Sequence, residues 1–234
     1  MPADAAPSWL LLPELGAVGE RLEFSADDLH YLTRVCRVRA GERVTATDGR
    51  GGVAVLHLEA DGPALRGSVE SVEQRERSRE AWLLCGAPEA DRGDWLVEKL
   101  GELGVAVFQP VDCARGTWER AARRRDRWSR LTAAAVRQSR SPFRIELREP
   151  LPLAEALGRL PEGGSRWLAD EAGPRKAAGV AGSPVVGAVG PAAGFDDPEW
   201  SSLRERGFEP MCLSGNRLRS ETAALAWAAW WAAG

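Results

Sequence analysis

The sequence has few residues that could bind a metal or form disulfides. Its two histidines, His30 and His57, lie far apart, and its four cysteines include no CxxC pair. Such spacing offers no zinc ligand set and is typical of reduced cysteines in a cytosolic protein. Cys85 and Cys212 lie in apolar runs, so we expect them in the core. We therefore expect no metal, no disulfides and a cytoplasmic location.

Long apolar runs and nucleotide-binding motifs are also lacking. The longest apolar run, residues 223–233, is too short to cross a bilayer. Residues 1–12 lack the basic region and the full apolar segment of a signal peptide. No GxGxxG motif, Walker loop or zinc pattern occurs. These absences argue against a membrane protein, a dinucleotide enzyme and a nucleoside triphosphatase.

Positive charge comes almost entirely from arginine rather than lysine. The net charge is −3, so no overall basic field indicates nucleic acid. Arginine is nevertheless clustered, at Arg34, Arg37 and Arg39 and again over residues 120–130. Genomic base composition explains the arginine content simply, whereas the guanidinium's ability to bind phosphate bidentately offers a functional explanation. The two explanations are compatible.

Residues 1–74 have the pattern of a small β-rich domain. The turn 48–52 separates two alternating runs, which predicts a hairpin. Ser25 and Asp28 resemble a capping box that opens a short helix through Val35. The strands are expected at residues 21–24, 43–47, 53–58 and 65–72. Short strands with tight turns favour a small barrel, followed by a charged linker at 73–80.

From residue 81 onward, strands alternate with helices, which predicts an α/β domain with a parallel sheet covered on both faces. Strands are expected at residues 82–85, 105–111, 145–147, 166–169, 184–189 and 209–213. Helices are expected at residues 91–103, 118–138, 153–160, 198–206 and 220–233.

Two turns near the C-terminus have the composition of a ligand site. Residues 189–195 and 213–222 each follow an expected strand, and ligands of open α/β sheets bind outside the carboxyl ends of the strands. Gly190, Gly194 and Gly215 would expose bare backbone there, although each could also be an ordinary turn glycine. We expect the two turns to form one site.

Six segments, in order along nearly the whole chain, carry a family resemblance. They are His30-Tyr31-Leu32 with Arg34-Val35, Gly41 and Asp48-Gly49; Glu98-Lys99 with Glu102-Leu103-Gly104-Val105 and Pro110; Gln138-Ser139; Gly190-Pro191 with Gly194-Phe195; Leu218-Arg219; and Glu221-Thr222-Ala223. This set resembles the bacterial ribosomal RNA small-subunit methyltransferase E family, which makes N3-methyluridine in 16S RNA.

The resemblance implies a SPOUT-class methyltransferase. Residues 75–234 would form an α/β domain with a C-terminal trefoil knot, and residues 1–74 an RNA-binding, PUA-like β-barrel. The implied protein is a homodimer that binds S-adenosylmethionine (SAM) in the knot, near the subunit boundary. Its implied partner is the 16S rRNA of the small ribosomal subunit.

The resemblance also assigns candidate site residues. The cofactor-binding candidates are Leu168, Val189, Gly190, Pro191, Gly194, Leu213, Ser214, Gly215 and Leu218. The RNA-binding candidates are His30, Arg34, Arg37, Arg39, Gln138 and Arg140. The catalytic candidates are Arg219 and Glu221.

Chemistry supports Arg219 more strongly than Glu221. Methylation of uracil N3 removes a proton and spreads negative charge over the flanking carbonyl oxygens, which a positioned guanidinium can stabilise. Arg219 could instead bind phosphate or simply be solvated. Glu221 falls in the first turn of the last helix, where a carboxylate stabilises the helix dipole. A general-base role for Glu221 is the alternative.

Three departures from the family pattern touch the expected cofactor and RNA contacts, and they are compatible with altered affinity, a shifted target or lost catalysis. Ala192-Ala193 replace Glu-Gly, Asn216-Arg217 replace a basic and a β-branched residue, and Arg137 and Ser141 replace Glu and Arg. A catalytically degenerate RNA-binding homologue that keeps the fold and the dimer is therefore the alternative. A metabolite-binding protein unrelated to RNA would leave the barrel and its arginines unexplained.

The last helix carries three tryptophans, Trp227, Trp230 and Trp231, around most of its circumference. A helix that is apolar on all sides is buried on several sides. Core packing explains this pattern, and a dimer interface is the more specific interpretation.

Overall fold

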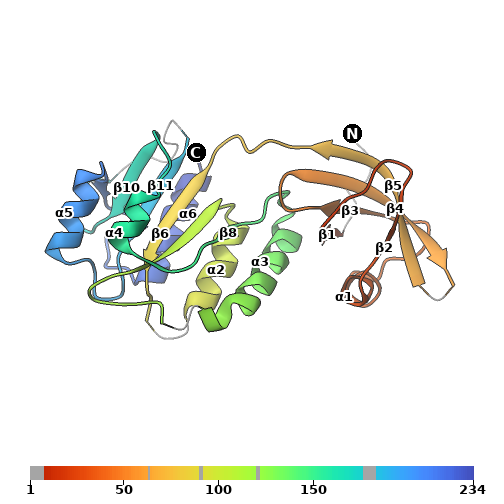
Figure 1. Cartoon of the computed structure of the whole chain (residues 1–234), viewed down its shortest axis with the longest axis horizontal. Coiled ribbons are helices and arrows are strands. Elements are labelled where there is room, and N and C mark those ends of the chain that lie inside the picture. The colour runs from red at the N-terminus through yellow and green to blue at the C-terminus, as the bar shows by residue number, and fades with distance from the viewer. Residues whose placement is uncertain (1–7, 63, 90–91, 120–121, 176–182) are drawn as a thin grey trace. The chain divides into compact units, whose positions relative to one another are not determined.

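The computed structural model describes residues 8–62, 64–89, 92–119, 122–175 and 183–234. The chain divides into two compact units (Figure 1). The first unit contains residues 1–77 and 136–144, and the second contains residues 78–135 and 145–234. The short segment 136–144 therefore belongs with the N-terminal residues, from which it is distant in sequence.

The first unit is built on a five-stranded sheet. In spatial order its strands are β1 (Trp9–Leu11), β3 (Arg43–Thr47), β4 (Gly52–Asp61), β5 (Ala64–Gln74) and β2 (Arg21–Glu23). β1 pairs with β3 in parallel, and the other pairs are antiparallel. The expected hairpin is confirmed, whereas β1 was not expected. The core of this unit includes the fully buried Leu10, Leu32 and Leu56.

The expected capped helix of the first unit is also confirmed. Helix α1 (Ala26–His30) begins after Ser25, whose hydroxyl accepts a hydrogen bond from the backbone N–H of Asp28 at 3.1 Å. It continues as one π-helical stretch, η1 (Tyr31–Val35). Single π-helical turns are rare and recur at functional sites.

The second unit contains a parallel sheet of seven strands. In spatial order they are β12 (Glu209–Met211), β10 (Ser165–Ala169), β11 (Val185–Val189), β6 (Ala81–Gly86), β7 (Val107–Asp112) and β8 (Glu146–Leu147), with β9 (Leu151–Pro152) also on β7. The helices are α2 (Arg92–Glu102), η2 (Ala122–Arg124), α3 (Arg125–Ser139), α4 (Leu153–Gly158), α5 (Asp197–Glu205) and α6 (Ser220–Ala232).

Helices cover both faces of this sheet, as expected. Successive side chains of β6 point to opposite faces of the sheet. Leu83 packs in one core with residues of α2 and α6, and Leu84 packs in a second core with residues of α4 and α5. Helix α6 follows the edge strand β12, yet it packs on β6, β11 and α2. The last segment of the chain thus returns to the middle of the sheet.

The long helix expected from Trp118 begins later, at Arg125, and residues 120–121 of that expectation lie outside the described residues. Trp118 lies in an irregular segment instead. Its backbone N–H donates to Asp112 at 2.6 Å, and its indole N–H donates to the carbonyl of Cys85 at 2.9 Å. These long-range bonds fix Trp118 outside a helix.

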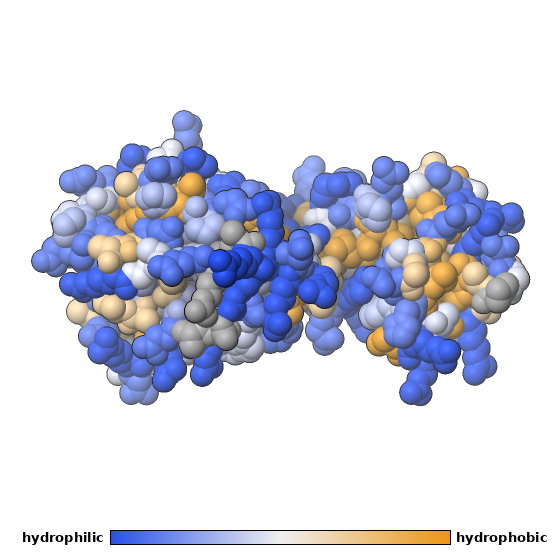
Figure 2. Space-filling view, turned by 60° about the horizontal axis from the view of Figure 1, so that its bottom comes forward, coloured by the Kyte–Doolittle hydropathy of each residue, from blue (hydrophilic) through white to orange (hydrophobic). Residues whose placement is uncertain are grey.

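One of the two cysteines expected in the core lies there. All four cysteines are free thiols. Cys85 is buried as expected, but Cys212 is only half-buried because β12 ends one residue earlier. Hydrophilic residues cover much of the face drawn in Figure 2, with hydrophobic residues showing between them. Among the described residues, none of the helices has the length and apolarity to span a bilayer.

Candidate functional site

A cavity of about 240 Å³ opens in the second unit at the carboxyl ends of β10, β11 and β12. Three turns contribute to it, because the carboxyl ends of parallel strands meet at one edge of the sheet. Its lining residues are Ala169, Asp170, Glu171, Val189, Gly190, Pro191, Ala192, Gly194, Phe195, Trp200, Leu213, Ser214, Asn216, Arg217, Leu218, Ser220 and Ala223. The two turns singled out in the sequence therefore do meet.

The turn after β11 is compact and depends on glycine. The N–H of Gly194 donates to the carbonyl of Pro191 at 2.8 Å, and Gly194 has a φ of +76°. A Cβ atom on Gly190 would lie 3.1 Å from the backbone nitrogen of Phe195. The chain thus folds back tightly, which leaves main-chain atoms facing the cavity.

Neighbouring loops fasten this turn from outside. The N–H of Ala192 donates to the carbonyl of Ala87 at 3.2 Å. The guanidinium of Arg115 donates to the carbonyls of Ala193 and Phe195 at 3.4 and 3.3 Å. Helix α5 then begins at a capping box in which Asp196 and Glu199 bond each other's backbone N–H groups. The turn is therefore held before any ligand binds.

The turn after β12 is held by its own polar groups. The N–H of Asn216 donates to the Ser214 hydroxyl at 3.1 Å. The Cys212 thiol donates to the carbonyl of Ser214 at 2.9 Å. Arg175 lies close by, because a Cβ atom on Gly215 would come within 3.0 Å of its guanidinium. Helix α6 begins directly after this turn, at Ser220.

Sequence reasoning missed the charged side chains of the cavity. Asp170 and Glu171 follow β10, and Arg217 lies in the last turn. The signal for the two acids was available, since they follow a predicted strand just as the other two turns do. They place two carboxylates at the cavity beside one guanidinium.

Two of the proposed cofactor residues do not line the cavity. Leu168 is fully buried in the core on the α4 and α5 side of the sheet. Gly215 lies in the last turn, but it does not line the cavity, although its neighbours Ser214 and Asn216 do. The other seven cofactor candidates all line the cavity, namely Val189, Gly190, Pro191, Gly194, Leu213, Ser214 and Leu218.

The two catalytic candidates lie at the edge of the cavity rather than in its lining. Arg219 occupies the N-cap position of α6, and its side chain is 64% exposed, 3.9 Å from Glu89. Glu221 is buried, with its Oε1 4.0 Å from Nε of Arg92. Its Oε2 has no hydrogen-bond partner among the described residues. Arg219 can reach a substrate from solvent, whereas Glu221 is enclosed.

Cysteine chemistry is disfavoured at this edge of the sheet. Burial raises the pKa of the Cys85 thiol far above its usual value, and nearby Cys113 and Glu221 add to the effect. Burial likewise raises the pKa of Cys113 to about 12, with a smaller contribution from Glu199. Because the thiolate is the nucleophile, a raised pKa disfavours nucleophilic attack by either residue at neutral pH.

The six RNA-binding candidates all belong to the first unit. They come from two segments, one with His30, Arg34, Arg37 and Arg39 and the other with Gln138 and Arg140, and every one is exposed. Within the described part of the chain, no carboxylate pairs with the side chain of any of the four arginines. Their charges are therefore available to an anion.

The second arginine cluster is partly ion-paired inside its own unit. Arg124 and Arg127 both pair with Asp94, and Arg125 pairs with Glu149. Arg120 lies outside the described residues. These ion pairs make residues 122–130 a weaker candidate for phosphate binding than the first unit.

The cavity at the strand ends of a parallel α/β sheet accompanies a small β domain, four of whose exposed cluster arginines have no ion pair among the described residues. This combination is compatible with an RNA-modifying enzyme that has a separate RNA-binding domain. Comparison with known families agrees. The model of an RNA methyltransferase domain matches residues 75–232, and that of an RNA methyltransferase PUA domain matches residues 24–63.

Comparison with individual proteins narrows the class. The chain is 30% identical over 207 residues to ribosomal RNA small subunit methyltransferase E of Synechocystis, covering 83% of this chain and 67% of that protein. Its fold matches the crystal structure of the enzyme of that name from Neisseria gonorrhoeae, bound to S-adenosyl methionine. The TM-score is 0.83, the identity 27%, and the match covers 95% of both chains.

A second solved structure, of a probable rRNA methyltransferase from Porphyromonas gingivalis, matches with a TM-score of 0.78. It is 26% identical and covers 95% of this chain and 96% of that one. The chain belongs to the ribosomal RNA small subunit methyltransferase E family. The fold class expected from the sequence, an α/β domain with a parallel sheet and a PUA domain, is confirmed.

Proposed function

We propose that this protein transfers a methyl group from SAM to N3 of a uridine in 16S ribosomal RNA. The observation that carries the proposal is the cavity formed by the turns after β10, β11 and β12, with main-chain atoms and three charged side chains at its wall. Membership of the family supports rRNA methylation, and the solved relative bound to S-adenosyl methionine supports the cofactor.

The composition of the cavity suits the cofactor. SAM has a ribose, an ammonium group and a carboxylate, in addition to its sulfonium. Asp170 and Glu171 are suited to the hydroxyl and ammonium groups, and Arg217 to the carboxylate. The bare backbone at Gly190 and Gly194 would allow close approach of the nucleoside.

For this reaction the protein must mainly orient the two reactants and stabilise the negative charge that develops on the uracil. SAM supplies the methyl group as an activated electrophile, so no metal is required. The uracil N3 proton would pass to solvent, and negative charge would develop on the flanking carbonyl oxygens. The anionic N3 would then accept the methyl group as its bond to sulfur breaks. Arg219, exposed at the start of α6, is the guanidinium that would stabilise this charge. The burial of Glu221 supports a structural role at the N-terminus of α6.

We further propose that α6 ends a knotted chain and contributes to a homodimer interface. The return of α6 from the edge strand to the centre of the sheet supports the knot. Trp227 is fully buried within the chain, whereas Trp230 and Trp231 are half-buried, so a partner would meet the exposed parts of these two side chains. Trp230 also packs edge-to-face on Trp167, at 5.9 Å between ring centroids.

One observation favours the alternative, a non-catalytic RNA-binding homologue. Ala192 and Ala193 are exposed in the turn after β11 and offer no polar side chain, where the family resemblance predicts a carboxylate. The fixed backbone of this turn and the carboxylates from the β10 turn support retained binding instead.

The deciding experiment is complementation. The chain is expressed in a bacterial strain whose 16S RNA lacks N3-methyluridine, and the nucleosides of that RNA are analysed by mass spectrometry. Restored N3-methyluridine is the expected result, and Arg219→Ala should abolish it. Unchanged RNA together with normal binding of a 16S transcript would favour the non-catalytic homologue.

A further inference from the structure

One guanidinium joins the two cationic segments of the first unit. Arg137 lies in the last turn of α3, and its Nη2 donates to Oδ1 of Asp28 at 3.2 Å, across 109 positions of sequence. The two side chains are only 25% and 13% exposed. The guanidinium also lies over the ring of Tyr31, 4.6 Å from its centroid. Asp28 and Tyr31 belong to the helical segment that carries Arg34 and precedes Arg37.

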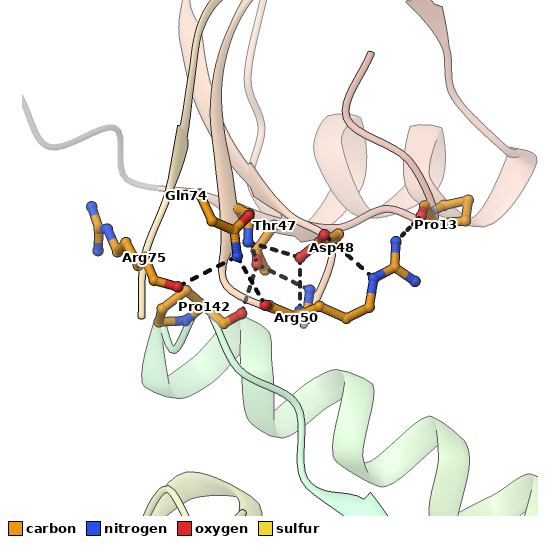
Figure 3. Close-up of polar contacts among 9 residues, drawn as sticks. Pro13, Thr47, Asp48, Arg50, Gln74, Arg75 and Pro142 are labelled. Atoms are coloured by element: carbon orange, nitrogen blue, oxygen red, sulfur yellow. Dashed lines mark hydrogen bonds and ion pairs between the residues drawn. The ribbon is translucent and has the colours of Figure 1, made fainter. Parts of the chain in front are cut away.

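The residues that follow Arg140 are also held in the first unit, by hydrogen bonds to the β3–β4 hairpin. The carbonyl of Pro142 accepts hydrogen bonds from the N–H of Gly51 at 3.0 Å and from the Thr47 hydroxyl at 3.1 Å. The N–H of Arg144 donates to the carbonyl of Gly49 at 2.8 Å. Figure 3 shows Pro142 beside Thr47, the last residue of β3, just before the hairpin turn that leads to β4. Residues 138–140 are thus fixed at both ends to the first unit.

The backbone at two of the RNA-binding candidates is strained. Arg37 and Arg140 have φ values of +59° and +55°, the only non-glycine residues with positive φ among those described. This conformation is unfavourable for L-residues, and glycine would adopt it without steric cost. Both arginines are exposed and unpaired within the described residues. Each lies at the end of a helical segment, Arg37 after η1 and Arg140 after α3, where a residue with positive φ commonly caps the helix.

We propose that Arg137 is a positioning residue for RNA binding, which holds Arg140 beside the 30–39 segment so that the two form one surface for the RNA phosphate backbone. Consecutive Cα atoms lie about 3.8 Å apart, so the Cα of Arg140 lies within about 11 Å of that of Arg137. Arg137 itself is largely enclosed and acts through Arg140. The inference rests on the proposed function only in taking RNA as the ligand.

A double-mutant cycle tests this role. A fluorescently labelled transcript of small-subunit ribosomal RNA is titrated with wild type, Arg137→Ala, Arg140→Ala and the double variant at several salt concentrations. Each single variant should weaken binding roughly tenfold, the size of one lost charge-assisted hydrogen bond. Each should also lower the slope of log K against log salt by about 0.7 to 0.9.

The double variant decides the question. If Arg137 acts through Arg140, the RNA affinity of the double variant lies within about threefold of that of Arg140→Ala alone. Once the Arg140 side chain is absent, the loss of Arg137 has nothing further to misplace. A fully additive loss of roughly a hundredfold would overturn the proposal. So would RNA affinity within twofold of wild type for Arg137→Ala.

Matched variants separate positioning from folding. Arg159→Ala removes an exposed charge from the second unit, outside both arginine clusters, and should leave RNA affinity within about twofold. Arg137→Lys keeps the charge but not the planar stacking group, so it should recover binding in part. Asp28→Asn preserves the shape of the side chain while removing its negative charge. Its effect on RNA affinity should also be non-additive with that of Arg140→Ala, as expected for Arg137→Ala. Full RNA affinity in Asp28→Asn would contradict the proposal.

SAM binding separates this inference from the proposed function. The cavity belongs to the second unit, so Arg137→Ala should leave SAM affinity unchanged. If the wild type binds RNA but not SAM, the proposed function fails, and the cycle still decides the role of Arg137.

Discussion

Gly86, the last residue of β6, lies against the turn that follows β11. A Cβ atom at this position would come 2.3 Å from the backbone nitrogen of Pro191, about 1 Å closer than ordinary van der Waals contact. The opposing atom is backbone, so a rotamer change cannot relieve the clash. Gly86→Ala should therefore displace Pro191 and its neighbour Gly190 from the wall of the cavity.

The size of the effect follows from the contacts at stake. Overpacking of this kind costs about 1–3 kcal/mol. If the displaced turn loses two backbone hydrogen bonds to SAM at about 1 kcal/mol each, affinity falls roughly 30-fold. Isothermal calorimetry with SAM measures this loss, and thermal denaturation measures any accompanying loss of stability.

A matched glycine controls for the substitution itself. Gly158 ends α4, and a Cβ atom there would meet nothing within 4 Å. Gly158→Ala should leave SAM affinity unchanged. If Gly86→Ala bound SAM within twofold of wild type and kept its stability, the turn after β11 would not contact the cofactor, and the reasoning would be refuted.

Three further predictions concern single residues. Arg219→Ala should abolish methyl transfer while SAM affinity, measured by calorimetry, stays within a few-fold, because the side chain lies outside the cavity lining; a large loss of SAM binding would contradict its catalytic role. Tyr31 is the only tyrosine, and burial followed by its contact with Cys36 raises its pKa from 10.0 to about 12. Its neutral form stabilises the fold fully below about pH 10, and this contribution is lost as pH rises toward 12. Phenolate absorbance should therefore show a midpoint near 12 in the folded protein, and a midpoint near 10 would contradict the burial. Arg37→Gly relieves the strain of a positive φ in the folded state, but glycine also raises the conformational entropy of the unfolded chain. Because these effects oppose each other, denaturant titration should give a free energy of unfolding within about 1 kcal/mol of wild type. RNA affinity should nevertheless fall in this variant, and unchanged affinity would remove Arg37 from the RNA-binding surface.

Local pattern was sufficient to predict the two kinds of architecture. Alternation around the turn at 48–52 predicted the hairpin of β3 and β4, and the strand–helix rhythm after residue 81 predicted the parallel sheet. Because strand ends of a parallel sheet share one edge, the meeting of the two glycine-bearing turns could also be predicted.

Features set by long-range contacts were not predictable in this way. Helix α3 begins seven residues later than expected because Trp118 bonds to Cys85 and Asp112, which no local pattern reveals. Residues 136–144 join the first unit through hydrogen bonds to the hairpin turn, and nothing in their own sequence indicates this. Arg137 stands where the family pattern has a glutamate. Its hydrogen bond to Asp28, which is distant in sequence, gives this replacement a structural explanation.

The family relationship and the cavity together lead to one central statement, that the turns at 189–195 and 213–218 hold SAM. The most direct measurement is a calorimetric titration of the full-length chain with SAM. The account predicts saturable heat with one site per chain, reduced by Gly86→Ala and unchanged by Gly158→Ala. The absence of heat at millimolar SAM with folded protein would contradict it.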